Sequence, residues 1–339
     1  MDVLGLTFDE IAAARAARPH ELKPLRAAYR RLMFGEPADG PLQADVLPIA
    51  RRIEAGELTK FVQRTHDGLE IEAVLVPMRR RGEAWKTLCV SSQIGCARGC
   101  LFCETAQLGF LRNLAPGEIV GQVVAAQRAF GGRVRNVVFM GMGEPFDNFD
   151  NVTQAIRVLF DRGGLSFAGE RIRISTVGRT AGIRRLAALG WRRIDLAISL
   201  NAPNDEIRSR IMPINRLEPM EALRAALLAY PLRNCQFFMV EYVLIPGVND
   251  AREHARELAD YLRPLRCIVN VIPYNPRHES PWQAPHEPDV VRFLHWVNEA
   301  GQRCTRRVTK GRSQMAACGQ LGNRHLVSGS PPDGGAPPT

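Results

Sequence analysis

The stretch LCVSSQIGCARGCLFC, residues 88–103, decides how this chain of 339 residues is interpreted. An apolar, strand-like segment leads directly into a loop that carries Cys96, Cys100 and Cys103 with the spacing C-x3-C-x2-C. Three thiolates on a tight loop can each bind one iron of a cubane cluster, which leaves the fourth iron without a protein ligand. The pattern therefore predicts a [4Fe–4S] cluster with an open iron that can bind a reaction partner.

A structural zinc site is the alternative at the same residues. It usually needs four ligands in two C-x2-C pairs, and the sequence has no second pair and no matching histidine spacing. Four of the eight cysteines lie within fifteen positions, which in a reducing compartment indicates metal or redox chemistry. We expect one cluster whose open iron binds S-adenosylmethionine, because an electron passed to the sulfonium would give a 5′-deoxyadenosyl radical.

Downstream of the cysteine loop, short apolar segments alternate with amphipathic segments of helix length. Counting Leu88 to Ser91, they give six strands, and this rhythm is typical of βα units in a parallel sheet. Six strands are too few for a closed eight-stranded barrel. The expected fold is therefore α/β, a partial (β/α)6 TIM-like barrel with a small N-terminal helical accessory domain. The other five segments are 137–140, 172–176, 196–200, 237–245 and 267–272.

The chain divides into three predicted parts. Residues 1–70 carry helical patterning and a basic stretch, and they form the accessory domain. Residues 71–327 form the barrel and a C-terminal loop. Residues 328–339 are mostly Ser, Gly, Pro and Asp and cannot offset their ordering entropy, so we expect a disordered tail.

Composition restricts the partners. Lys and Arg outnumber Asp and Glu by 45 to 35, and the net charge of +10 suits a polyanion such as nucleic acid, although a solvated Arg-rich surface would give the same balance. No run approaches the roughly 18 apolar residues of a membrane helix, and the start of the chain lacks a basic region followed by an apolar stretch. We expect a cytoplasmic protein without a membrane partner.

Four longer segments carry a family resemblance: TLCVSSQIGC (87–96), GFLRNL (109–114), MGMGEP (140–145) and AACGQL (316–321). In this order, over about residues 70–325, they resemble the RlmN/Cfr family of the radical S-adenosylmethionine superfamily. Members of that family methylate an adenine of 23S ribosomal RNA and, in some cases, of transfer RNA. The resemblance implies an S-adenosylmethionine-dependent RNA (adenine) methyltransferase that acts at carbon 2, with carbon 8 as the alternative position.

The resemblance also implies three catalytic residues. Cys318 is the S-methylcysteine that carries the carbon, because carbon 2 of adenine has no nucleophilic lone pair and needs a radical route. Cys89 is the resolving thiol, and it forms a transient disulfide with Cys318 that cytosolic reductants can reopen. Glu72 is the proton acceptor. Strand alternation alone would make Glu72 a solvent-facing residue, with Glu70 as a nearby competitor.

For S-adenosylmethionine, the resemblance implies that Gly143 lets the backbone approach and that Glu144 pairs with the ammonium group. Asn201 replaces the histidine usual in the family, so only a hydrogen-bonding role is expected of it. Glu104 stands where the family commonly has a small residue. The other positions that match cofactor contacts are Ser175, Ser199, Leu200 and Asn275.

The implied partners are ribosomal or transfer RNA, with the target base splayed out of its stack, and an electron donor such as flavodoxin or ferredoxin. We expect a monomer. Two other readings stay open: a radical enzyme with a non-RNA substrate, and an RNA-binding protein with structural zinc in place of the cluster. The candidate phosphate contacts are Arg79, Arg80, Arg81, Arg112, Arg303, Arg306, Arg307, Lys310 and Arg312.

Overall fold

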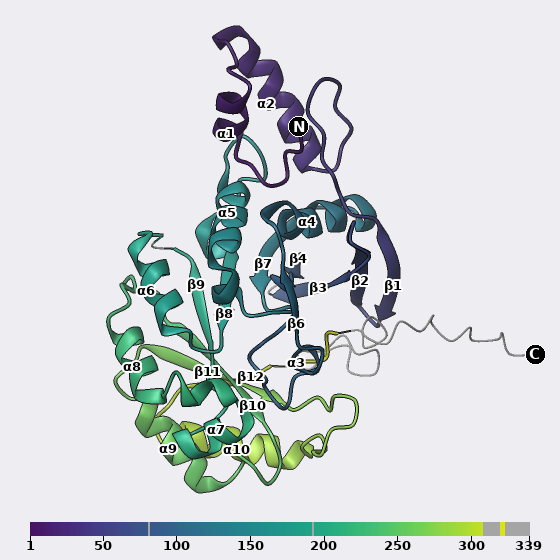
Figure 1. Cartoon of the computed structure of the whole chain (residues 1–339). Coiled ribbons are helices and arrows are strands. Elements are labelled where there is room, and N and C mark those ends of the chain that lie inside the picture. The colour runs from purple at the N-terminus through teal and green to yellow at the C-terminus, as the bar shows by residue number, and fades with distance from the viewer. Residues whose placement is uncertain (81, 192, 308–318, 323–339) are drawn as a thin grey trace, which may run out of the picture.

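The computed structural model describes residues 1–80, 82–191, 193–307 and 319–322 of the chain. Its central feature is one curved ten-stranded sheet (Figure 1). Seven consecutive strands of this sheet run parallel, and the first six lie at the six places that the sequence indicates, so the partial barrel is confirmed. These first six strands are β4 (Glu83–Cys89), β7 (Val134–Phe139), β8 (Ile172–Thr176), β9 (Asp195–Ser199), β10 (Phe238–Leu244) and β11 (Cys267–Pro273).

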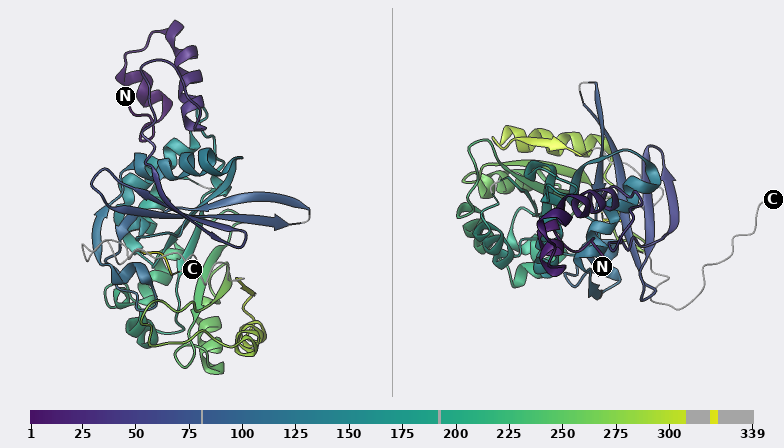
Figure 2. Two further views of the ribbon diagram at one scale, coloured as in Figure 1. Left: turned by 90° about the vertical axis from the view of Figure 1, so that its right-hand side faces the viewer. Right: turned by 90° about the horizontal axis from the view of Figure 1, so that it is seen from above.

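Helices connect the parallel strands and lie along the outer side of the sheet (Figures 1 and 2). Each buries an apolar stripe, as α5 (Phe149–Phe160) does with Val152, Ile156 and Leu159. No helix in the described ranges has the length and apolar character needed to cross a membrane. The other connecting helices are α4 (Pro116–Phe130), α6 (Thr180–Ala188), α7 (Asp205–Ile211), α8 (Met220–Leu228), α9 (Arg252–Leu262) and α10 (Glu287–Glu299), with the 3-10 turns η1 (Pro145–Asn148), η2 (Gly169–Arg171) and η3 (Pro213–Arg216).

Three antiparallel strands extend the sheet beyond β4: β3 (Glu70–Arg80), β2 (Leu58–Arg64) and β1 (Ile49–Ala55). At the other edge, β12 (Cys304–Arg306) runs parallel to β11. The expectation of helical patterning up to residue 70 is therefore wrong for residues 49–64. In β2, residues 58–63 are all buried, so the strand lacks the polar and apolar alternation that would have revealed it.

Two N-terminal helices, α1 (Phe8–Ala14) and α2 (Pro19–Met33), project from one end of the molecule (Figure 1). Val3, Leu4 and Phe8 are buried in the same apolar core cluster as the barrel strands. The helices thus share a core with the barrel, and the division of the chain at residue 70 stays a prediction. The predicted tail, 328–339, lies outside the described residues.

The cysteine loop is enclosed by a two-stranded sheet, β5 (Gln93–Gly95) with β6 (Phe110–Asn113), and by the short helix α3 (Glu104–Gln107). Gly95 has φ +74°, and a Cβ there would lie 1.8 Å from the carbonyl oxygen of Gly109. Only glycine permits this close approach, which brings the two ends of the loop together.

Candidate active site at the mouth of the barrel

The three clustered cysteines line one cavity of about 160 Å³ at the carboxyl ends of the parallel strands. The N–H of Cys96 donates to the carbonyl of Gly109 at 2.7 Å, and the N–H of Cys103 donates to that of Cys100 at 3.1 Å. The rest of the loop is fastened by the ion pair of Arg98 with Asp147, 2.8 Å long. The loop is therefore held in shape by the surrounding protein.

Burial controls the protonation of these thiols. It raises the pKa of Cys96 to about 12, and it raises the pKa of Cys100 and of Cys103 as well. Charge repulsion from the neighbouring cysteines adds to the shift at Cys96 and Cys100. The thiols are thus neutral near pH 7, and coordination to metal is what would stabilise them as thiolates.

The three thiols have the donor chemistry of a cubane cluster. Within the described ranges, no group of three or more His, Cys, Asp or Glu side chains is placed to bind one metal ion. A cubane needs no such convergence, because each thiolate binds a different iron. A structural zinc ion would need four ligands around one point. The cysteine loop supplies three thiols, which matches the donor set of a cluster with one open iron.

Gly143 and Glu144 line the same cavity. The Glu144 carboxylate is 2% exposed and accepts from the N–H of Val177 at 2.9 Å and of Phe146 at 3.1 Å. Burial raises the pKa of Glu144 to about 7. No cationic side chain among the described residues pairs with this carboxylate. The ammonium group of a ligand would supply the missing counter-charge.

The other expected cofactor positions lie at the ends of neighbouring strands. Ser175 and Ser199 line the cavity with their Oγ atoms 3.3 Å apart, and Asn275 lines it as well. Leu200 is buried, and its carbonyl accepts from Nε of Arg208 at 3.1 Å. The sequence thus predicted residues that the fold brings to one place, although their contact with a cofactor remains a prediction.

Asn201 lines the cavity in a left-handed conformation, φ +59°, which asparagine tolerates better than most residues. Its amide oxygen accepts from the N–H of Val243 at 2.9 Å, and its amide nitrogen lies 3.3 Å from Sδ of Met212. The side chain is therefore already engaged in fastening β10 to the loop after β9.

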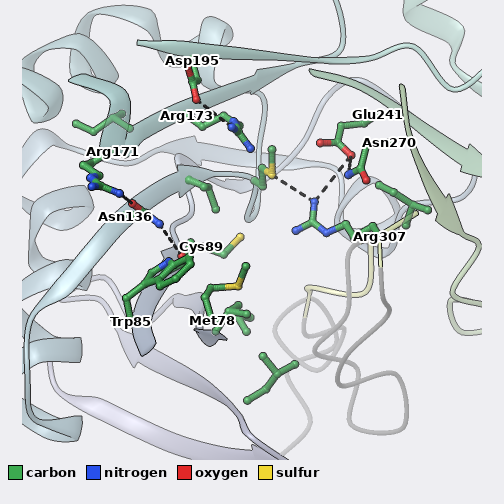
Figure 3. Close-up of a pocket in the computed structure, with 18 of the residues that line it drawn as sticks. Met78, Trp85, Cys89, Asn136, Arg171, Arg173, Asp195, Glu241, Asn270 and Arg307 are labelled. Atoms are coloured by element: carbon green, nitrogen blue, oxygen red, sulfur yellow. Dashed lines mark hydrogen bonds and ion pairs between the residues drawn. The ribbon is translucent and has the colours of Figure 1, made fainter. Parts of the chain in front are cut away.

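A second cavity, of about 630 Å³, occupies the inside of the barrel (Figure 3). Alternate residues of β4, namely Trp85, Thr87 and Cys89, line it, as expected for one face of a strand. Cys89 therefore faces the interior and is reached from this cavity. The two cavities adjoin, since they share the lining residues Met140, Glu241, Ile272, Asn275 and Arg307.

The far end of the second cavity is polar. Figure 3 shows Trp85, Asn136, Arg171, Arg173 and Asp195 there, away from Arg307. Arg173 pairs with Asp195 at 2.9 Å. With its amide oxygen turned toward the indole, Asn136 accepts from Nε1 of Trp85 at 3.0 Å. The indole is thereby fixed as part of the cavity wall.

Glu72 is buried, with 2% exposure, so the expectation that alternation makes it solvent-facing is wrong. It lies on the same face of β3 as Val74, whose register partner is Cys89. Alternation shows which residues share a face but not whether that face is covered. Glu70 is buried too, but Arg51 and Arg64 pair with it.

Residues 319–322 form a docked segment. The carbonyl of Gly319 accepts from the N–H of Glu104 at 2.7 Å, and that of Leu321 accepts from Oγ1 of Thr105 at 2.6 Å. The N–H of Gly322 donates to Oε2 of Glu72 at 2.9 Å. This segment follows Cys318, which lies outside the described residues, so the expected meeting of Cys318 with Cys89 stays a prediction.

Comparison with known proteins places the chain in a family. The sequence profile of the Radical SAM superfamily matches residues 90–261. RlmN 1 of Protochlamydia amoebophila, named a probable dual-specificity RNA methyltransferase, is 44% identical over 285 residues, which cover 84% of this chain and 78% of that protein. The chain belongs to the RlmN family.

Further relatives support this membership of the RlmN family. The dual-specificity RNA methyltransferase RlmN of Nitratidesulfovibrio vulgaris is 36% identical over 346 residues and matches 95% of this chain and 94% of its own length. The crystal structure of a radical SAM methyltransferase from Sphaerobacter thermophilus has a TM-score of 0.86 at 37% identity, covering 94% of this chain and 98% of that one. The family resemblance is thus confirmed, and the superfamily implies S-adenosylmethionine and a [4Fe–4S] cluster.

The arginines proposed to contact RNA are mostly paired. Arg112 bonds to Asp67 at 2.6 Å and to Glu118 at 2.8 Å, and these bonds raise its pKa. Arg112 therefore serves the fold. Arg79 pairs with Glu57 and Arg306 with Glu287. Arg81, Lys310 and Arg312 lie outside the described residues, and the side chain of Arg80 is not described.

Two buried cations escaped the sequence reasoning. Arg208 is fully buried and donates to the carbonyls of Leu200 and Val177, which ties together two loops of this RlmN-family site. Lys60 is 4% exposed and pairs with Glu72 at 2.9 Å. The apolar context of Lys60, in LTKFV (58–62), was the available signal.

Proposed function

We propose that the protein is a radical S-adenosylmethionine RNA methyltransferase that transfers one carbon through Cys318 to carbon 2 of an adenine in ribosomal or transfer RNA. The single observation that carries the proposal is the position of Cys89. It faces a nucleotide-sized cavity that adjoins the cavity lined by the three cysteines. A thiol beside a substrate cavity, next to a cluster loop, matches the requirement for a resolving thiol.

Cys96, Cys100 and Cys103 would hold one [4Fe–4S] cluster, and S-adenosylmethionine would occupy its open iron. When bound, this pair supplies an electron and a 5′-deoxyadenosyl radical. Glu144 binds the ammonium group, and Gly143 leaves room for it. The remaining contacts come from Ser175, Ser199, Asn201 and Asn275 in the cavity walls, and from Leu200, which is buried next to Asn201.

The carbon carried by Cys318 would first be joined to the adenine ring in a covalent protein–RNA adduct, and the ring radical formed in this addition would return one electron to the cluster. The chain's own residues then release the product from this adduct. The Glu72 carboxylate accepts the ring proton, and the electron pair of the C–H bond stays in the ring. The Cys89 thiolate attacks the sulfur of Cys318, which forms a disulfide and breaks the bond from that sulfur to the transferred carbon. The electron pair of the broken bond passes to that carbon, which takes up a proton to become a methyl group. A cytosolic reductant restores the two thiols.

The second cavity would receive the target nucleotide. Its volume lies in the usual range of about 300–1,000 Å³ for ligand sites. RNA bases that are modified in this way leave their stack and enter a pocket with aromatic and polar walls. Trp85 and Arg171 give the far end of the cavity that character.

The cellular setting belongs to the same proposal. Exposed Cys235 and the thiols of the site suit the reducing cytoplasm. We infer a monomer that receives electrons from a flavodoxin or ferredoxin, with residues 1–70 acting as an accessory domain for RNA. Carbon 8 of adenine stays the second candidate position, and a non-RNA substrate the second candidate class.

The test uses anaerobically reconstituted protein with S-adenosylmethionine, a reductant and total RNA, followed by mass spectrometry of the hydrolysed nucleosides. Methyladenosine should appear with the wild-type chain and with Cys235→Ala, a matched control at an exposed cysteine. It should be absent with Cys318→Ala and Cys89→Ala. The retention time of the product distinguishes carbon 2 from carbon 8. Formation of 5′-deoxyadenosine without methyladenosine would reject the RNA substrate.

A further inference from the structure

Lys60 is an unusual lysine, because it lies inside the protein at 4% exposure. A buried ammonium group is costly unless it is paired. Nζ of Lys60 lies 2.9 Å from Oε2 of Glu72, whose side chain is equally buried. Each charge thus compensates the other within the core of the sheet, and the position of one depends on the other.

The sheet register places this pair beside the resolving thiol. Lys60 in β2 stands opposite Val74 in β3, and Val74 stands opposite Cys89 in β4. Glu72 lies two residues from Val74 on the same face, the usual separation of diagonal neighbours on a sheet. Lys60, Glu72 and Cys89 therefore occupy one patch of the inner face, where Leu58 and Val74 line the second cavity.

The same carboxylate oxygen has a second donor. The N–H of Gly322 reaches Oε2 of Glu72 at 2.9 Å. The backbone of Glu72 is fixed as well, since its carbonyl accepts from Oγ of Ser91 at 2.6 Å. Glu72, in β3, is thus bonded to β2 through Lys60, to the loop after β4 through Ser91, and to the segment that follows Cys318 through Gly322. Both of these side-chain contacts use Oε2, and Oε1 is the other oxygen that can take up a proton.

We propose that Lys60 is a positioning residue for the release step, an assignment that rests on the proposed role of Glu72 as proton acceptor. Lys60 holds Oε2 of Glu72 toward the N–H of Gly322, so that Oε1 is presented to the substrate. Without the Nζ donor, the Glu72 side chain loses one of the two contacts that fix its Oε2, and Oε1 is no longer held toward the ring proton. Lys60 is not among the described residues that line the cavity of Cys96, Cys100 and Cys103, so we expect formation of the protein–RNA adduct not to need it.

The experiment compares Lys60→Met, Lys60→Arg and Lys86→Met in single-turnover reactions under anaerobic conditions, with an RNA that the wild-type chain methylates. Adduct is separated on denaturing gels, and methyladenosine is quantified by mass spectrometry. Lys86 is the matched control, because its Nζ donates to the carbonyls of Phe130 and Gly131, away from Glu72. If Lys60→Met does not fold, Lys60→Gln is the second variant.

We expect Lys60→Met to form adduct at a rate within about twofold of wild type and to release product about 10–100-fold more slowly, a part of what general-base catalysis contributes. Lys60→Arg, which keeps the charge, should restore most of the release, and Lys86→Met should match wild type. Unchanged release in Lys60→Met, or equal loss of adduct and product in both Lys60 variants, would overturn the proposal.

A measurement that does not depend on enzyme activity tests the role of Lys60 separately from the proposed function. Hydrogen exchange at the amide of Gly322 should be faster in Lys60→Met than in wild type and unchanged in Lys86→Met. In Lys60→Met, the Glu72 carboxylate that accepts the hydrogen bond of this amide is no longer held by Lys60. If the wild-type chain makes no methyladenosine, the proposed function fails, and the exchange data still decide whether Lys60 positions Glu72. Equal exchange in all variants would show that it does not.

Discussion

Replacing Gly143 by alanine tests how the cofactor cavity is built. The residue has φ +96°, and a Cβ there would lie 2.5 Å from Cβ of Gln93 and 2.8 Å from its backbone nitrogen. A positive φ costs a residue with a side chain roughly 1–2 kcal/mol. Overpacking adds about 1–3 kcal/mol, because the Gln93 backbone is fixed by its bond to Met142. The expected loss of folding free energy is thus about 2–5 kcal/mol.

The matched control is Gly190→Ala. Gly190 has φ +66° but nothing within 4 Å of the added Cβ, so only the backbone cost of about 1–2 kcal/mol applies. Urea unfolding followed by circular dichroism gives the two free energies, and equilibrium dialysis gives the affinity for S-adenosylmethionine. We expect Gly143→Ala to lose more stability than the control and to lose binding as well. Equal destabilisation by both variants, with binding intact, would refute the packing argument.

Three further predictions concern the same site. Burial raises the pKa of Glu144 to about 7, so the carboxylate becomes charged as pH rises through 7. Equilibrium dialysis should therefore show that S-adenosylmethionine binds about tenfold more tightly at pH 8 than at pH 6. The variant Glu144→Gln should abolish this pH dependence. The variant Arg208→Met leaves the carbonyls of two loops without a donor, so urea unfolding should show a loss of about 3–5 kcal/mol in folding free energy. The control Arg224→Met, at a partly exposed helix position, should lose under about 0.5 kcal/mol. Cys100→Ser should reduce the iron bound after anaerobic reconstitution to background, while Cys235→Ala should bind iron as wild type does.

The sequence predicted the parallel strands because each is short, apolar and followed by a helix-length segment. The sequence also predicted that the glycine- and serine-rich strand ends meet at one mouth of the barrel. In the structure, Gly143, Ser175 and Ser199 line one cavity. These features are local, because the sequence of each βα unit is enough to indicate its strand and its helix. The family resemblance supplied the roles of Cys89 and Glu72, which residue patterns alone could not assign.

What the sequence missed depends on contacts between distant segments. Residues 58–63 of β2 are all buried, so neither this strand nor the burial of Lys60 follows from alternation. The Glu72 carboxylate is covered by Gly322, which bonds to it from 250 residues away. Periodicity describes the faces of one element, whereas the covering of a face is decided by elements far along the chain.

The order of strands in the sheet bears on how the protein is made. Apart from the small pair β5 and β6, every strand lies beside the next one in the chain, from β1 to β12. Each new strand can therefore join a finished edge while the chain is still being synthesised, since folding proceeds from the N-terminus. The contacts of residues 319–322 with Glu104, Thr105 and Glu72 come last in chain order among those described. A nascent chain would thus complete its barrel before its active site, and a chain that stops short of residues 319–322 would have its strands paired but its active site incomplete.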